Sequence, residues 1–125
     1  MAKVLTWMSE PEETRSMAAF LTSAGHEAIV ASDIDDFNSL AKIEAQTGNP
    51  IKVAIVKVDH DWVCDRAFIG VHAAKNIQPP VKIIAICCCS KGLSEAMVNN
   101  RCAEALLKRQ IPYLPSVIPH VLATA

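Results

Sequence analysis

Cysteines are the side chains of this sequence with the most evident chemistry. Cys87, Cys88 and Cys89 are consecutive and close a strongly apolar run, and Cys64 lies in a polar stretch after an earlier apolar run. Thiolates are good ligands for Zn²⁺ and Cu(I), and His60 would add an imidazole. One interpretation is therefore a thiol-based redox or soft-metal sensor. The other is that buried cysteines pack as small apolar side chains, which we favour because the sequence has no Cys-x₂-Cys pair.

A second candidate cluster is Asp59-His60-Asp61, which places two carboxylates beside an imidazole. Such a group can do acid–base or metal chemistry, and this would suit a small α/β enzyme. We favour a solvated loop instead, because short acidic clusters of this kind are common and no nucleophile stands in an elbow motif. The expected protein is therefore not an enzyme.

The glycines are scattered singly and form no phosphate-binding loop; they are Gly25, Gly48, Gly70 and Gly92. Nucleotide-binding α/β proteins place a glycine-rich loop directly after a strand. Because no such loop follows any apolar run here, the sequence predicts neither a nucleotide enzyme nor a bound cofactor.

Strands and helices alternate along the chain in a way that would position these residues. Pro11, Glu12 and Glu13 suit the start of a helix, and Asp33 is expected to cap the next one. By their periodicity, the strands are expected at residues 3–7, 28–31, 53–58, 81–88 and 113–114. The helices are expected at residues 11–24, 34–47, 67–75, 94–109 and 119–125, the last a stub.

This alternation predicts one three-layer α/β domain over residues 1–125, with a parallel sheet and right-handed crossovers. A composition of 51% hydrophobic and 20% charged residues agrees with a packed domain. A formal charge of −1 excludes the strong field that gathers nucleic acid, and no apolar run is long enough to span a membrane. We expect a cytoplasmic protein, because there is no secretory leader and the number of cysteines is odd.

Two short motifs carry a resemblance to a known family. Residues 3–11 read Lys-Val-Leu-Thr-Trp-Met-Ser-Glu-Pro, and residues 113–118 read Tyr-Leu-Pro-Ser-Val-Ile. The first is similar to the apolar strand and Asp-Asp-Glu-Pro that open the receiver domains of bacterial response regulators. The second is similar to the Tyr-Leu-Pro-Lys-Pro-Phe that closes them. Together with the order of elements, the resemblance implies a flavodoxin-like fold with strand order 2-1-3-4-5.

The resemblance also implies where a phosphorylation pocket would lie, and this sequence departs from it. Met8 and Ser9 stand where receivers have two carboxylates that hold Mg²⁺, and a thioether is a poor ligand for that ion. Lys57 aligns with the phosphoacceptor aspartate, although a two-residue slip would place Asp59 there. The positions of this degenerate pocket are Met8, Ser9, Lys57, Asp59, Cys87 and Ser116.

The last two positions of that pocket are Cys87 and Ser116. Cys87 falls in the stretch aligned with the hydroxyl residue that ends strand four, and Ser116 aligns with the lysine that neutralises the phosphoryl group. Phosphoryl transfer depends on the metal and the lysine to stabilise charge on the phosphoryl oxygens. The sequence therefore predicts an atypical, receiver-like signalling domain that acts through protein contacts without aspartate phosphorylation.

The C-terminal third is the expected working surface, because receivers signal through the face made by helix four, strand five and helix five. A shortened last helix would leave apolar residues uncovered unless a protein partner or a second copy covers them. We interpret the missing cover as a sign of homodimerisation; a tail that folds back over its own edge is the alternative. The expected interaction surface comprises Arg101, Lys108, Tyr113, Val117 and Ile118.

Overall fold

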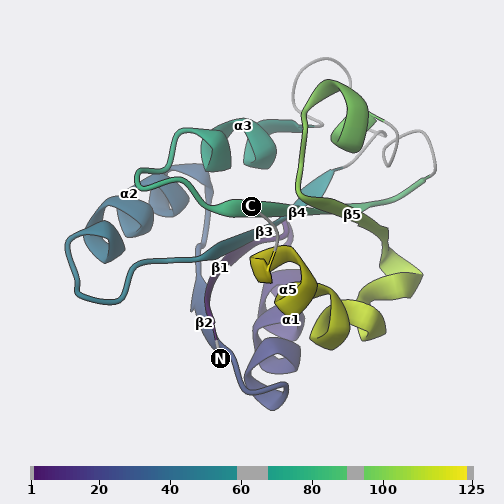
Figure 1. Cartoon of the computed structure of the whole chain (residues 1–125), viewed down its shortest axis with the longest axis horizontal. Helices are drawn as coiled ribbons and strands as arrows, with labels where there is room; N and C mark the ends of the chain where they lie inside the picture. The colour runs from purple at the N-terminus through teal and green to yellow at the C-terminus, as the bar shows by residue number, and fades with distance from the viewer. Residues whose placement is uncertain (1, 59–67, 90–94, 124–125) are drawn as a thin grey trace.

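A computed structural model describes residues 2–58, 68–89 and 95–123 of the chain. Within these ranges, one parallel sheet has the strand order β2-β1-β3-β4-β5, as expected from the sequence (Figure 1). Its strands are β1 (Lys3–Trp7), β2 (Glu27–Val30), β3 (Val53–Val58), β4 (Lys82–Cys87) and β5 (Glu104–Leu107). Four candidate residues from the sequence analysis lie outside the described residues: Asp59, His60, Asp61 and Cys64.

Helices cover both faces of this sheet and complete the three-layer, flavodoxin-like arrangement (Figure 1). The α-helices are α1 (Pro11–Ser23), α2 (Ile34–Ala45), α3 (Ile69–Lys75) and α5 (Leu114–Ala123). A π-helical turn, η2 (Glu95–Asn99), precedes β5, and a 3₁₀ helix, η3 (Lys108–Tyr113), follows it. None of the described helices is long and apolar enough to cross a lipid bilayer.

The first two helices begin where the sequence indicates. Pro11 stands at the start of α1, where its missing N–H leaves no hydrogen bond unmade. The Asp33 carboxylate accepts a hydrogen bond from the backbone N–H of Asp36 at 2.7 Å and so caps α2. These local interactions explain why both boundaries could be predicted.

Alternate residues of each strand enter two separate apolar layers. Leu5, Val56 and Ala85 belong to the layer that also contains residues of α2 and α3. Val4 and Ile55 belong to the opposite layer, together with residues of α1 and α5. Figure 1 shows α1 and α5 on one side of the sheet and α2 and α3 on the other. The side of the sheet on which a residue lies therefore decides which groups it can contact.

The C-terminal third differs from the sequence prediction. No long helix spans 94–109 in the described part of the chain, because residues 104–107 form β5 and pair with β4. The register joins Ile84 to Glu104 and Cys87 to Leu107, so this segment completes the edge of the sheet. The strand expected at 113–114 was wrong, because Tyr113 ends η3 and Leu114 begins α5.

The last helix is also longer than predicted. α5 runs over ten residues and buries Leu114, Ile118 and Val121 against the sheet. Pro115 lies in its first turn, where proline is tolerated, and Pro119 lies inside it. Part of the apolar surface that a stub would have left uncovered, Ile118 above all, is therefore covered by the chain's own helix, whereas Tyr113 and Leu122 stay exposed.

Candidate functional site

The turn after β1 holds Met8 and Ser9, the first two positions of the pocket expected from the sequence. The backbone N–H of Met8 donates a hydrogen bond to Thr14 Oγ1 at 3.0 Å, and that hydroxyl donates to the Glu10 carbonyl at 2.9 Å. Met8 is 2% exposed and packs in the α1–α5 layer. Ser9 has a φ of 69°, and its buried Oγ has no hydrogen-bond partner among the described residues. The turn thus presents a thioether and one hydroxyl.

Lys57 lies near the end of β3 and points toward α1. Trp7, the last residue of β1, pairs with Val56 of β3. Met8 and Lys57 each follow one member of this pair, so they lie at neighbouring strand ends. The Lys57 side chain is 7% exposed, and its Nζ donates to Glu13 Oε1 at 2.8 Å. A buried ammonium group therefore occupies the end of the central strand.

Lys108 is the residue that directly follows β5, and it reaches the same carboxylate. Its Nζ lies 3.4 Å from Glu13 Oε2, so one acid on α1 bridges two lysines from different strand ends. Burial raises the pKa of Glu13, but the hydrogen bond and charge of Lys57, helped by Lys108, outweigh it and hold that pKa below its ordinary value. The carboxylate is therefore ionised and electrostatically satisfied at neutral pH.

The position of Lys108 corrects the assignment of Ser116. The sequence alignment placed Ser116 at the lysine position of receivers, on the expectation of a strand at 113–114. In the structure Ser116 is an exposed residue of α5, and the cation that follows the fifth strand is Lys108. The sequence missed Glu13 as a site residue, because an acid in the first helical turn is ordinarily a helix-dipole partner.

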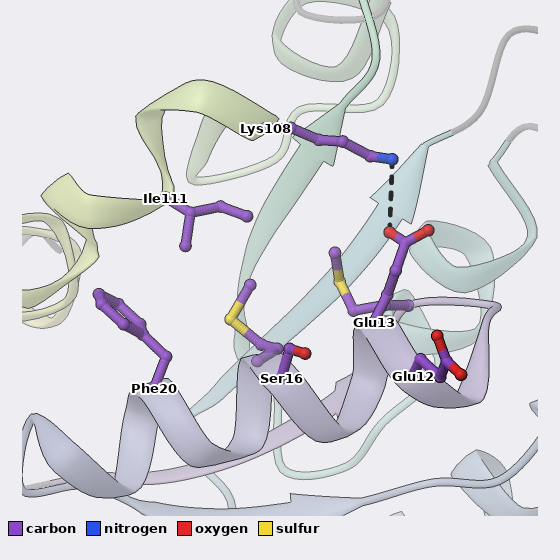
Figure 2. Close-up of a pocket in the computed structure, with 8 residues that line it drawn as sticks. Glu12, Glu13, Ser16, Phe20, Lys108 and Ile111 are labelled. Carbon is purple, nitrogen blue, oxygen red and sulfur yellow. Dashed lines mark ion pairs between the residues drawn. The ribbon is translucent and has the colours of Figure 1, made fainter.

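A pocket of about 340 Å³ opens between α1 and the start of η3, beside this charge network (Figure 2). Glu13 and Lys108 face one another across it, and Phe20 lies opposite Ile111 farther along α1. The pocket thus has a charged end next to Met8 and an apolar end farther along the helix.

Comparisons with known proteins support the architecture. No protein-family model matches this sequence, and a comparison with curated proteins finds no match. A response regulator from Thermotoga maritima superposes with a TM-score of 0.73 at 15% identity, covering 99% of each chain. A response regulator receiver domain protein from Clostridium thermocellum gives a TM-score of 0.74 at 20% identity, covering 98% of this chain and 94% of its own. A Francisella receiver domain gives 0.72 at 14% identity, covering 98% and 97%.

The chain has the receiver fold. These identities are low, so the similarity concerns the arrangement of strands and helices over nearly the whole chain. Within the receiver fold, the ligand edge lies beyond the carboxyl ends of the strands, where the strand order reverses between β1 and β3. Met8, Lys57 and Lys108 all lie at or just beyond these strand ends.

Cys87 lies on the other side of the receiver sheet from Lys57. It packs in the layer with α2 and α3 and shares that layer with Cys102, whereas Lys57 points toward α1. Burial raises the pKa of the Cys87 thiol to about 12 and that of Cys102 to about 11. No group of three His, Cys, Asp or Glu side chains in the described ranges could hold a metal ion. Cys87 therefore does not join the charged residues in one pocket, contrary to the expectation from sequence.

We expect the thiols to differ strongly in reactivity. With its pKa raised to about 12, the Cys87 thiol is far less ionised at pH 8 than an ordinary thiol, and it is also buried. Cys88 is exposed, so N-ethylmaleimide should alkylate it about 100-fold faster than Cys87 or Cys102. Peptide mapping by mass spectrometry over time measures these rates. Equal labelling of Cys87 and Cys88 would contradict the burial argument and revive the thiol-sensor interpretation.

The expected interaction surface is only partly exposed in this receiver fold. Tyr113 is 64% exposed and Arg101 is exposed with a φ of 53°. Lys108 is half-exposed and engaged by Glu13, and Val117 is partly buried. Ile118 is fully buried, so its assignment to the surface was wrong. The reason is the longer α5, which turns Ile118 toward the sheet.

Proposed function

We propose that this chain is an atypical receiver-like signalling domain that acts through protein contacts without phosphorylation of an aspartate. The observation that carries the proposal is the buried Lys57–Glu13 ion pair, 2.8 Å long, at the end of β3. The resemblance to receivers aligns the phosphoacceptor carboxylate with Lys57, or with Asp59 after a two-residue slip. Here the group at the strand end is a cation, and it neutralises the acid of α1 that lies against it.

The electrostatics of the strand ends oppose binding of Mg²⁺. A magnesium ion needs several oxygen ligands, and receivers supply two of them as acids after the first strand. Met8 supplies a soft thioether in that place, and the nearby Glu13 carboxylate is held by both Lys57 and Lys108. A buried ammonium group would also repel a divalent cation a few ångströms away. Without the metal, a transferring phosphoryl group lacks the divalent cation that holds and neutralises its oxygens.

The proposal does not depend on the absence of a lysine after the fifth strand. A lysine does follow the fifth strand, which supports assigning the lysine position of receivers to Lys108 instead of Ser116. Its ammonium group lies 3.4 Å from Glu13 Oε2. The proposal therefore rests on the metal-binding acids, which Met8 and Ser9 replace, and on the cation at Lys57.

Incubation with acetyl phosphate and Mg²⁺ tests this function directly. We expect intact-mass spectrometry to find no added phosphoryl group on the full chain. The reason is that the described residues offer no site for Mg²⁺ and that the chain has a lysine, not an aspartate, at position 57. The matched control is Asp59→Asn, which removes the acid at the alternative aligned position. A phosphoryl adduct in the wild type that is lost in Asp59→Asn would contradict the proposal.

The partner surface that we propose lies beside β5, the edge strand of the sheet. Val98 is 71% exposed and Met97 40% exposed on η2, before β5, and Tyr113 is 64% exposed after it. Arg101 is exposed between η2 and β5. Large apolar side chains around an open strand edge favour contact with another protein. The homodimer remains part of this proposal, although α5 covers part of the surface that first suggested it.

Light scattering at micromolar concentration tests the homodimer. We expect a dimer mass for the wild type and a shift toward the monomer in Val98→Asp, because a charge at an apolar contact is costly to desolvate. Lys42→Asp on α2 serves as a control for a charge change at an exposed site on a helix that packs against β1 and α3. A wild type that stays monomeric would exclude the homodimer and leave a different protein as the partner.

A further inference from the structure

The pocket between α1 and η3 has the size and shape of a small-molecule site. Its volume of about 340 Å³ lies at the lower end of the range of roughly 300–1,000 Å³ that such sites occupy. Phe20 and Lys108 line it from opposite sides, one from α1 and one from the end of β5 (Figure 2). Its position suits a compact ligand that contacts both elements.

The part of the pocket farther from the charges is apolar. Met17 is buried beneath it, and Phe20 and Ile111 are partly buried on its two walls. In Figure 2 the Phe20 ring and the Ile111 side chain face each other across the opening. A ligand would gain stability by covering these groups with a hydrocarbon chain or ring.

The charged end of the pocket holds one lysine and two glutamates, so a ligand carboxylate would bind Lys108 in competition with Glu13. Lys108 is the one cation among its described lining residues, and its side chain is 49% exposed. Glu13 has a shorter ion pair with Lys57, 2.8 Å against 3.4 Å, and so keeps a partner when Lys108 turns toward a ligand. Glu12 and Glu13 also line the pocket and would repel a doubly charged phosphate more strongly than a single carboxylate.

We infer that this pocket binds a small amphiphilic monocarboxylate, with the carboxylate on Lys108 and the apolar part between Phe20 and Ile111. An ammonium–carboxylate hydrogen bond fixes the head group, and burial of the apolar part adds affinity. The inference does not depend on whether the domain is phosphorylated, since it rests on the pocket alone.

Octanoate is a suitable probe, and methyl-labelled methionine reports where it binds. We expect titration with octanoate to shift the NMR methyl signals of Met8 and Met17, which line the pocket. Met97 lies on η2 and is 40% exposed, so its signal should stay unchanged. Shifts at Met97 that equal those at Met8 and Met17 would mean non-specific association and would overturn the inference.

Two pairs of variants separate the head-group contact from the apolar one. Lys108→Gln should weaken octanoate binding about tenfold, whereas Arg109→Gln, an exposed neighbour outside the pocket lining, should not. Ser16→Trp should fill the opening and abolish binding, whereas Ala19→Trp on the same helix should leave it intact. All four positions are exposed, so the fold should be retained.

Comparison ligands decide the chemical class. Octanoate should bind more tightly than octanol, which lacks the charge, and octylamine should bind least because Lys108 repels it. Equal affinity for octanoate in Lys108→Gln and the wild type would overturn the assignment of the head group. Tighter binding of octylamine would assign the site to cations through Glu12 and would equally overturn it.

Discussion

Replacing Ile118 with alanine is expected to lower the free energy of unfolding by about 2–5 kcal/mol. Ile118 is fully buried and packs with Leu114 and Val121 of α5 against the sheet. Truncation would remove apolar contacts and leave a cavity in a layer that cannot fully collapse. Since small domains unfold with roughly 5–15 kcal/mol in total, this loss should be plain in a urea titration followed by circular dichroism.

Tyr113→Ala is the matched control for this prediction. Tyr113 lies five residues earlier and is 64% exposed, so its replacement should change the free energy of unfolding by no more than about 0.5 kcal/mol. A small loss for Ile118→Ala, similar to that of Tyr113→Ala, would place Ile118 on the surface. That result would favour the uncovered C-terminal face predicted from the sequence over the complete α5.

Glu13→Gln is expected to lower the free energy of unfolding by about 1–2 kcal/mol at pH 7. The substitution removes the carboxylate that lies 2.8 Å from the Lys57 ammonium, which is almost completely buried. Loss of one partner from a fully buried pair costs about 3–5 kcal/mol; we expect less because Glu13 is 34% exposed and water screens the pair. Urea titration measures the difference.

The reciprocal substitution, Lys57→Met, should cost less than Glu13→Gln. It removes the buried charge itself, and a methionine fits an apolar layer of similar shape. Glu13 would keep Lys108 as its partner and retain access to water. If Lys57→Met proved the more destabilising of the two, the interactions of the buried ammonium would outweigh the cost of burying its charge, and the argument from that cost would be wrong.

The effect of Glu13→Gln should also depend on pH. The folded protein holds the pKa of Glu13 below its ordinary value of 4.5, so the unfolded chain binds the proton more tightly. The stabilising contribution of the carboxylate is therefore fully present above pH 4.5 and is lost as the pH falls through the lower, folded pKa. The difference between wild type and Glu13→Gln should shrink over that range, and a difference that stays constant down to pH 3 would contradict the assignment.

Local sequence signals determined most of the fold. The apolar strands β1, β3 and β4 are continuous runs, as expected for strands buried on both faces. Pro11 and Asp33 marked the starts of α1 and α2 through interactions within a few residues. Met8 and Ser9 could be placed at the end of β1 because their position follows directly from that strand.

The direction of the side chains at the strand ends could be determined only from the assembled sheet. Lys57 and Cys87 were both placed at the ligand edge from sequence, yet the register of β3 and β4 sends them to opposite faces. Glu13 had no signal that distinguished it from Glu12, since both suit the first turn of a helix. Only the packing of α1 against the strand ends shows which acid meets the lysines.

The amino-acid sequence by itself determined the alternation of strands and helices, the first four strands and the placement of Met8 and Ser9 after β1. Tertiary structure decided the C-terminal third. Residues 104–107 read Glu-Ala-Leu-Leu, which has high helix propensity, but pairing with β4 makes them a strand. Once β5 lies there, Lys108 rather than Ser116 follows it, and α5 is long enough to bury Ile118. Hydrogen bonds and burial supplied by distant segments outweigh local preference at a sheet edge, and no short sequence window contains them.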